Sequence, residues 1–183
     1  MEDIGNGVLF DDTNPVGRYN FYYKPIETSQ ENNRYSRRVK LDRGHKCVLK
    51  ARYLGGAAGR RLVVDDFLCR GGGGGDGKVL MCTAIKFLQE KLHLSDETEV
   101  SLLAMADIHG DREERGKNKH LTYMQRQEKL VAYYTRTYGF EGIHSEPDSH
   151  IYGTHMSTTI GTIKDKCMAQ GGAGGKRTRR RKR

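Results

Sequence analysis

Five consecutive glycines, Gly71–Gly75, form the strongest candidate for a ligand-binding loop in this 183-residue chain. Residues 62–69 before them are mostly apolar, and residues 79–92 after them are apolar at helical spacing. This order predicts a strand, a glycine loop and a helix. The backbone N–H groups of such a loop and the positive end of the helix dipole point at one spot, which favours binding of a phosphate group.

Two other interpretations of the loop stay open. The first is a flexible loop that binds nothing. The second is a nucleotide-binding P-loop, because residues 72–79 read Gly-x-x-x-x-Gly-Lys-Val, and Asp107 at the end of a predicted strand would then be a magnesium ligand. A P-loop lysine is followed by Ser or Thr, whose hydroxyl ligates the metal. Val79 has no hydroxyl, so the sequence argues against this second interpretation.

The elements around the loop follow an α/β order. A helix over residues 77–92 is predicted by apolar residues on one face, with Asp76 as its N-cap. A second helix over residues 121–138 ends at Gly139. The predicted strands are an edge strand over 21–26, a hairpin of 39–41 with 47–54, a strand over 62–69, a strand over 100–106 buried on both faces, and two closing strands over 140–143 and 151–157 around a turn at 146–148.

Two segments of the sequence resemble motifs of one enzyme family. Residues 70–75, Arg-Gly-Gly-Gly-Gly-Gly, fit the pattern Arg-x-x-Gly-x-Gly. Residues 130–140, Leu-Val-Ala-Tyr-Tyr-Thr-Arg-Thr-Tyr-Gly-Phe, are similar to Ala-x-x-Phe-Tyr-x-Lys-x-Gly-Phe. In this order and at this distance they resemble the pyrophosphate loop and the second conserved helix of the GNAT superfamily of acetyl-CoA-dependent N-acetyltransferases. The resemblance covers about residues 60–160.

The resemblance implies a fold, a cofactor and a reaction. The fold would be α/β, with a GNAT-like mixed central sheet flanked by helices. The reaction would be acetyl transfer from acetyl-CoA, without a metal, to an amine of a small molecule or protein that attacks directly in a ternary complex. Tyr134, with Tyr133 as its rival, would be the general acid for the CoA thiolate. The cofactor-binding residues would be Arg70, Gly71, Gly72, Gly73, Gly74, Gly75, Gly77 and Lys78 at the pyrophosphate, and Val64, Phe67 and Leu68 along the pantetheine arm.

The attacking amine must lose a proton, so a nearby base is useful. Asp66 and His109 fall near the expected mouth between the two central strands, and both are candidates for this base.

The basic charge of the chain is concentrated at its C-terminus. The formal net charge is +9, but residues 176–183 hold seven of the 32 basic residues and no acidic one, which leaves 25 basic and 23 acidic residues elsewhere. The sequence therefore predicts a flexible leader over 1–18, one domain over 19–165, and a glycine-rich linker with a disordered basic tail over 166–183. Such a tail favours non-specific binding of nucleic acid or of a nuclear import receptor, and a basic-tailed, non-catalytic nucleic-acid-binding protein is the alternative to the enzyme.

The four cysteines, Cys47, Cys69, Cys82 and Cys167, are far apart in the sequence and form no Cys-x-x-Cys pair. At this density the sequence predicts reduced thiols and an intracellular protein of the cytoplasm or nucleus. No stretch approaches eighteen apolar residues, so no membrane insertion is expected.

Overall fold

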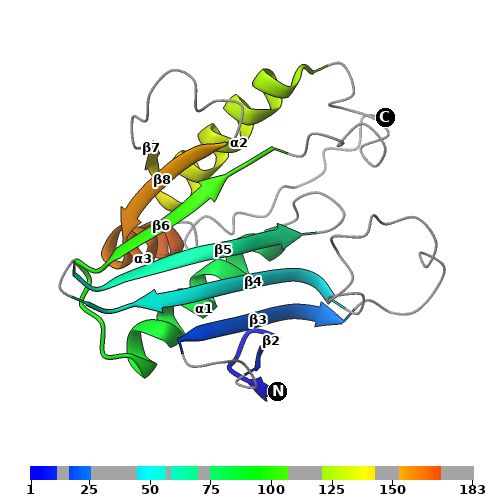
Figure 1. The fold of residues 1–183 in the computed structure, drawn as a ribbon. Helices are drawn as coiled ribbons and strands as arrows, with labels where there is room; N and C mark the ends of the chain where they lie inside the picture. Colours follow the sequence, from blue (N-terminus) through cyan, green and yellow to red (C-terminus); the bar gives the residue numbers. More distant parts are fainter. Residues whose placement is uncertain are drawn as a thin grey trace.

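The computed structural model describes residues 1–11, 17–25, 45–56, 59–69, 75–106, 121–142 and 153–169. Over these residues the protein is a mixed α/β structure, in which one mostly antiparallel, eight-stranded sheet is accompanied by three helices (Figure 1). The prediction of an α/β fold with a mixed sheet is confirmed at this level. The predicted strand over 39–41, the turn at 146–148 and the basic tail lie outside the described residues.

The N-terminal half of the sheet is a run of antiparallel neighbours. Its strands are β1 (Glu2–Asp3), β2 (Val8–Asp11), β3 (Arg18–Pro25), β4 (His45–Leu54) and β5 (Arg61–Cys69). The prediction of a flexible leader is wrong for residues 2–11, because the side chains of Val8 and Phe10 are 0% and 1% exposed. The predicted edge strand is also misplaced, because β3 pairs with β2 on one side and β4 on the other.

The C-terminal half contains the one parallel pair among the described strands. Helix α1 (Asp76–Lys91) joins β5 to β6 (Glu99–Ala104), which runs parallel to β5. Helix α2 (Tyr123–Tyr138), β7 (Glu141–Gly142), β8 (Thr154–Thr159) and α3 (Ile160–Ala169) follow. Strand β8 lies between β6 and β7, so the sheet order is β1-β2-β3-β4-β5-β6-β8-β7.

All three of these helices lie on one face of the sheet (Figure 1). Helix α1 packs on β2 to β5, and α3 packs against both α1 and α2. Strand β6 consequently alternates: Val100, Leu102 and Ala104 are buried, whereas Leu103 is 44% exposed. The prediction of a strand buried on both faces is wrong, because Glu99 and Leu103 on its outward face are exposed.

The two predicted helices around the core are confirmed. In α1 the residues with 0% exposure recur at helical spacing and form the centre of the core: Leu80, Met81, Ala84, Ile85 and Leu88. Helix α2 begins with a capping box between Thr122 and Gln125, and Gly139 ends it in the left-handed conformation at φ 76°. Helix α3 extends to Ala169, so the prediction of a linker from residue 166 is wrong for residues 166–169.

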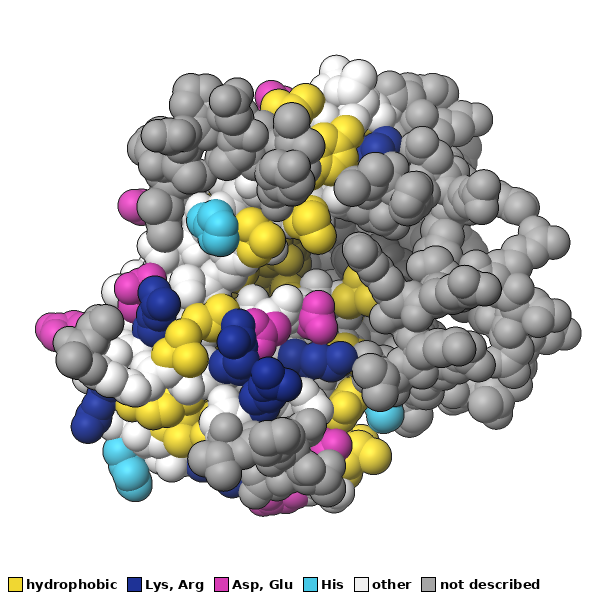
Figure 2. Space-filling view, in the orientation of Figure 1, with side chains coloured by type: hydrophobic (Ala, Val, Ile, Leu, Met, Phe, Trp, Pro, Cys, Tyr) yellow, Lys and Arg dark blue, Asp and Glu magenta, His cyan; other side chains and the backbone are white. Residues whose placement is uncertain are grey.

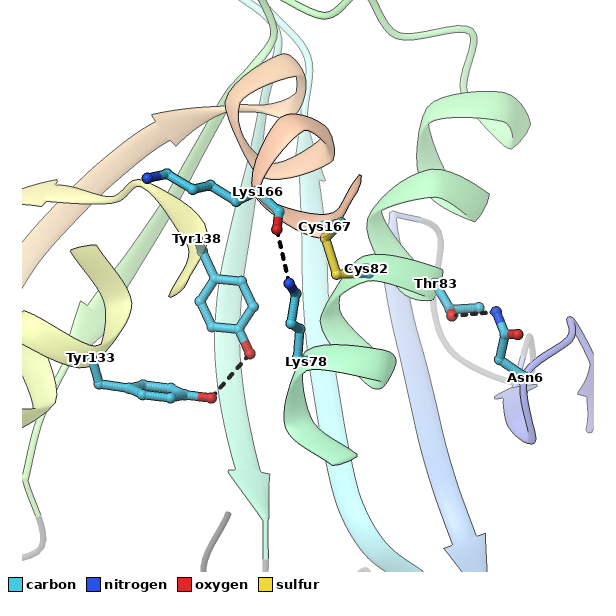
Figure 3. The surroundings of a disulfide bond; sticks show 8 residues. All are labelled: Asn6, Lys78, Cys82, Thr83, Tyr133, Tyr138, Lys166 and Cys167. Atoms are coloured by element: carbon cyan, nitrogen blue, oxygen red, sulfur yellow. Dashed lines mark hydrogen bonds between the residues drawn. A yellow bond between two sulfur atoms is a disulfide. The ribbon is translucent and has the colours of Figure 1, made fainter. Parts of the chain in front are cut away.

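The four cysteines form two disulfides, and the prediction of reduced thiols is wrong. Cys47 and Cys69 are register partners on β4 and β5, and Cys82 and Cys167 join α1 to α3 (Figure 3). These pairs are separated by 22 and 85 residues in the sequence. Only the strand register and the helix packing bring them together, which is why their spacing gave no indication of a bond.

No helix in the described part of the chain combines the length and the apolar character needed to cross a membrane.

Candidate functional site

The candidate site is the wedge between the diverging ends of β5 and β6. The two strands pair from Arg61 with Glu99 as far as Val64 with Leu102. Beyond this pair β5 continues to Cys69, and the structure describes pairing there only with β4. The β4–β5 register shifts at Lys50/Ala51 so that Asp65 is an extra residue, and a bulge of this kind increases the twist of a strand locally. The described pairing of these two parallel strands therefore ends before either strand does, and the strands diverge from there (Figure 1).

The N-terminus of α1 lies beside this wedge. Gly75 precedes the helix at φ 87°, a left-handed conformation that glycine adopts without strain. A Cβ atom on Gly77 would lie 3.2 Å from the Phe67 ring and 3.1 Å from the sulfur of Cys69. Glycine at position 77 therefore lets the first turn of α1 contact the end of β5 closely. Arg70 and Gly71–Gly74, the rest of the predicted loop, lie outside the described residues.

The first residue of α1 differs from its predicted role. Asp76 was expected as the N-cap, but the N-cap is Gly75, without a side-chain cap, and Asp76 is the first helical residue. Its carboxylate lies 2.5 Å from the Nζ atom of Lys46 on β4. The negative charge at the positive end of the helix dipole is thereby paired with a cation.

Lys78 was predicted to bind a phosphate, but in the structure its side chain bonds to another part of the protein. Its Nζ atom donates a hydrogen bond to the backbone oxygen of Lys166 in α3 at 2.8 Å (Figure 3). Burial lowers the pKa of Lys78. The ammonium group satisfies a carbonyl in the last turn of α3, and contact with a cofactor would require this bond to break.

Helix α2 brings three tyrosines to the inner side of the wedge. The ring centroids of Tyr134 and Tyr138 lie 6.3 Å and 6.1 Å from that of Phe67. The hydroxyls of Tyr133 and Tyr138 lie 3.3 Å apart, close enough for a hydrogen bond (Figure 3). Phe67 thus contacts the tyrosine rings of α2 and also Gly77 in the first turn of α1. It therefore connects Tyr134, the predicted general acid, to the N-terminus of α1.

The two buried tyrosines are held in their neutral form. Burial, together with the neighbouring Tyr133, raises the pKa of Tyr134 to about 12. Burial also raises the pKa of Tyr138, and its hydrogen bond with Tyr133 adds to that effect. Among the described residues the Tyr134 hydroxyl makes no hydrogen bond, although the residue is only 7% exposed. A neutral phenol without a partner among these residues can donate its proton to a bound ligand.

The candidate bases lie on the outer side of the sheet or outside the described residues. The Asp66 side chain is 65% exposed and lies 3.6 Å from the Nζ atom of Lys50. Its neighbour Asp65 instead accepts two hydrogen bonds of 2.6 Å from the Arg52 guanidinium, and the pair raises the pKa of Arg52. His109 is not among the described residues.

Gln127 supports the site, and sequence reasoning missed it. It is 3% exposed, and its Nε2 atom donates to the Ala104 oxygen at 2.7 Å and to Thr154 Oγ1 at 3.0 Å. Its Oε1 atom accepts a hydrogen bond of 2.8 Å from the backbone nitrogen of Ala106. This side chain fixes α2 to the end of β6. A glutamine between charged helix residues carries no sequence signal of such burial.

A concavity with a volume of about 500 Å³ lies elsewhere, between α1, α3 and the turn after β1. Its lining includes the Cys82–Cys167 disulfide and a hydrogen bond of 3.1 Å from Asn6 to Thr83 (Figure 3). None of the predicted site residues lines it. The described residues to which the sequence assigned chemistry therefore lie away from this groove.

Neither the known protein families nor the curated proteins contain a match to this sequence.

Proposed function

We propose that this protein is an N-acetyltransferase of the GNAT type, which transfers an acetyl group from acetyl-CoA to an amine. One observation carries the proposal: a helix that begins after a left-handed glycine and a buried, neutral tyrosine meet at the gap between two diverging parallel strands. The β5-α1-β6-α2-β7-β8 order agrees with the order of the motifs on which the resemblance rests.

The cofactor would lie in the wedge with its pyrophosphate at the N-terminus of α1. Loop N–H groups and the helix dipole attract a phosphate there, and pairing of Asp76 with Lys46 reduces the local repulsion. The pantetheine arm would lie along β5 at Val64, Phe67 and Leu68. Val64 is the last residue paired with β6, and beyond it the edge facing β6 has no described strand partner. The arm is an amide chain, so it can take the place of a neighbouring strand.

The reaction is a direct attack in a ternary complex. The amine nitrogen forms a bond to the thioester carbonyl carbon, the carbon–sulfur bond breaks, and the electron pair leaves with the CoA sulfur. Tyr134 gives its proton to this thiolate and regains one from solvent. The amine loses its proton to a base, for which Asp66 and His109 are the candidates. The raised pKa of Tyr134 keeps the phenol protonated at neutral pH, as a general acid requires.

The test is calorimetric titration with CoA, followed by an acetyl-transfer assay. We expect CoA to bind. At a concentration of 100 times its Kd, CoA should also raise the unfolding free energy by about 2.7 kcal/mol. Tyr134→Phe should lower kcat with little change in CoA affinity, while Tyr53→Phe, a matched change on β4, should leave both unchanged. Absence of CoA binding, or stabilisation by Mg-ATP instead, would overturn the proposal.

The degenerate P-loop interpretation has an additional difficulty in the structure. The P-loop lysine reaches the nucleotide phosphates, whereas Lys78 is engaged with the Lys166 carbonyl.

A second candidate function is nucleic-acid binding, favoured by the seven basic residues of segment 176–183. Such binding would be blind to base sequence, because the segment has no aromatic side chain to stack on bases. Double-stranded DNA affinity should fall steeply with salt, and deletion of residues 176–183 should abolish it. Binding that survives this deletion would rule out the tail as its source.

A further inference from the structure

The outer face of the wedge indicates which amines the site accepts. This inference rests on the proposed acetyl transfer and concerns the acceptor. We propose that the acceptor is the α-amine of a peptide chain whose first residues carry large apolar side chains. The three observations are an apolar rim, a balanced set of charges and the free strand edges.

Large apolar side chains border the wedge on the sheet face that no described helix covers. Leu68 on β5 is 50% exposed, and Leu103 and Met105 at the end of β6 are 44% and 48% exposed. Figure 2 views this face and shows hydrophobic side chains around a hollow near its centre. Contact with an apolar group of a ligand would remove the surface of each exposed leucine or methionine from water, which favours binding. A small polar amine would leave this rim in water.

Two described ion pairs lie near the rim. Arg52 is bonded to Asp65, and Lys50 lies 3.6 Å from Asp66. The more exposed carboxylate, Asp66, can attract one ammonium group to the entrance, but the two neighbouring cations repel a second. A polyamine carries several positive charges, so the balance disfavours it and favours an acceptor with a single amine.

The diverging strands offer hydrogen bonds that suit a peptide. Beyond Val64 and Leu102 the facing edges of β5 and β6 have no strand partner among the described residues. If the pantetheine arm lies along one edge, the other can pair with an extended chain through backbone N–H and C=O groups. A peptide also presents its side chains to alternate sides, which brings the first or second of them to the rim.

The type of amine follows from its acidity. An α-amine has a pKa of about 7.7–8.0, whereas a lysine side chain has one of about 10.4. Deprotonation of a lysine side chain near neutral pH therefore costs far more than that of an α-amine. An α-amine also lies directly beside its own side chain, which the apolar rim can then contact.

The experiment compares four acceptors with the full-length protein and acetyl-CoA. These are a peptide beginning Met-Leu, one beginning Ser-Gly, an N-terminally blocked peptide with an internal lysine, and spermidine. We expect kcat/KM for Met-Leu to exceed that for Ser-Gly by about tenfold to a hundredfold, the range of discrimination by apolar contacts. The blocked peptide and spermidine should react more slowly still.

Rim variants separate recognition from folding. Leu103→Ser with Met105→Ser should reduce the preference for Met-Leu over Ser-Gly, with CoA affinity unchanged. Leu54→Ser is the matched control, because Leu54 is 37% exposed on the end of β4 that pairs with Arg61, away from the wedge. It should leave the preference intact.

Each outcome bears on a different statement. Equal or faster transfer to lysine, to spermidine or to Ser-Gly would overturn this inference and leave the proposed acetyl transfer standing. CoA binding without transfer to either free N-terminus would also overturn it. Failure to bind CoA would instead overturn the proposed function on which it rests.

Discussion

The carboxylate of Asp76 lies 2.5 Å from the Nζ atom of Lys46, so the first residue of α1 is bonded to the start of β4. An acidic residue in the first turn stabilises a helix through its dipole, but it also occupies the field that would attract a phosphate. Asp76 and the pyrophosphate of the proposed cofactor would therefore compete for the same positive end of α1, and Lys46 would reduce that competition.

Replacement of Asp76 by Asn should strengthen CoA binding. A charge near a helix end is worth about 0.3–1 kcal/mol, which corresponds to an affinity gain of about twofold to fivefold, and Lys46 also becomes available to the phosphates. Titration calorimetry with CoA measures the change. Glu90→Gln at the other end of α1 is the matched control and should have no effect. Weaker binding by Asp76→Asn would show that the carboxylate supports the cofactor instead.

The sequence predicted best the elements that carry their own periodicity. Helix α1 was recognisable from its apolar spacing, and α2 from its terminal Gly139. Contacts between distant elements could not be predicted in this way. Cys82 meets Cys167 only because α3 packs on α1, and Val8 is buried only because β2 pairs with β3.

Part of the candidate site was also predictable. The sequence identified Tyr134 and Phe67 separately, and the structure brings their rings within 6.3 Å. Lys78 was predicted to bind the pyrophosphate, because a lysine after a glycine loop resembles a phosphate ligand. The side chain instead reaches the Lys166 carbonyl, a partner 88 residues away that no local pattern indicates.

The two disulfides should be detectable and stabilising. Thiol titration of the unreduced, denatured protein should find no free cysteine, and four thiols would contradict the structure. A cross-link stabilises mainly by restricting the unfolded chain, so loss of the Cys82–Cys167 bond, which spans 85 residues, should lower the unfolding free energy by about 3–5 kcal/mol. The variant with both cysteines changed to Ser measures this loss, and its difference from wild type should shrink under reducing conditions.

Gln127 should be far more sensitive to substitution than an exposed glutamine. Gln127→Met keeps the length of the side chain but leaves buried backbone groups at Ala104 and Ala106 unsatisfied, which costs about 1–3 kcal/mol for each group. Chemical denaturation should show a loss of at least about 2 kcal/mol. Gln89→Met is the control, because its bond to Asp96 is exposed, and it should cost less than about 1 kcal/mol. Similar costs for the two variants would contradict the anchoring role of Gln127.

Burial of Tyr134 should make the protein sensitive to alkaline pH. Its pKa is raised from about 10 in the unfolded chain to about 12 in the folded protein, so the folded state holds the proton more tightly. The resulting stability is fully present below pH 10 and is lost as the pH rises through 12. This loss amounts to about 2–3 kcal/mol, because each pKa unit corresponds to about 1.4 kcal/mol.

The variant Tyr134→Phe isolates this contribution. Phenylalanine does not titrate, so the difference in unfolding free energy between wild type and variant should be constant below pH 10 and should move in favour of the variant between pH 10 and 12. Tyr138 titrates in both proteins and cancels in the comparison, provided that its surroundings are unchanged. Urea denaturation at a series of pH values measures the difference. A difference that is independent of pH up to 12 would mean that water solvates the Tyr134 hydroxyl in the folded protein. A solvated phenol would lack the buried environment that keeps it neutral, and this would argue against Tyr134 as the general acid for the CoA thiolate.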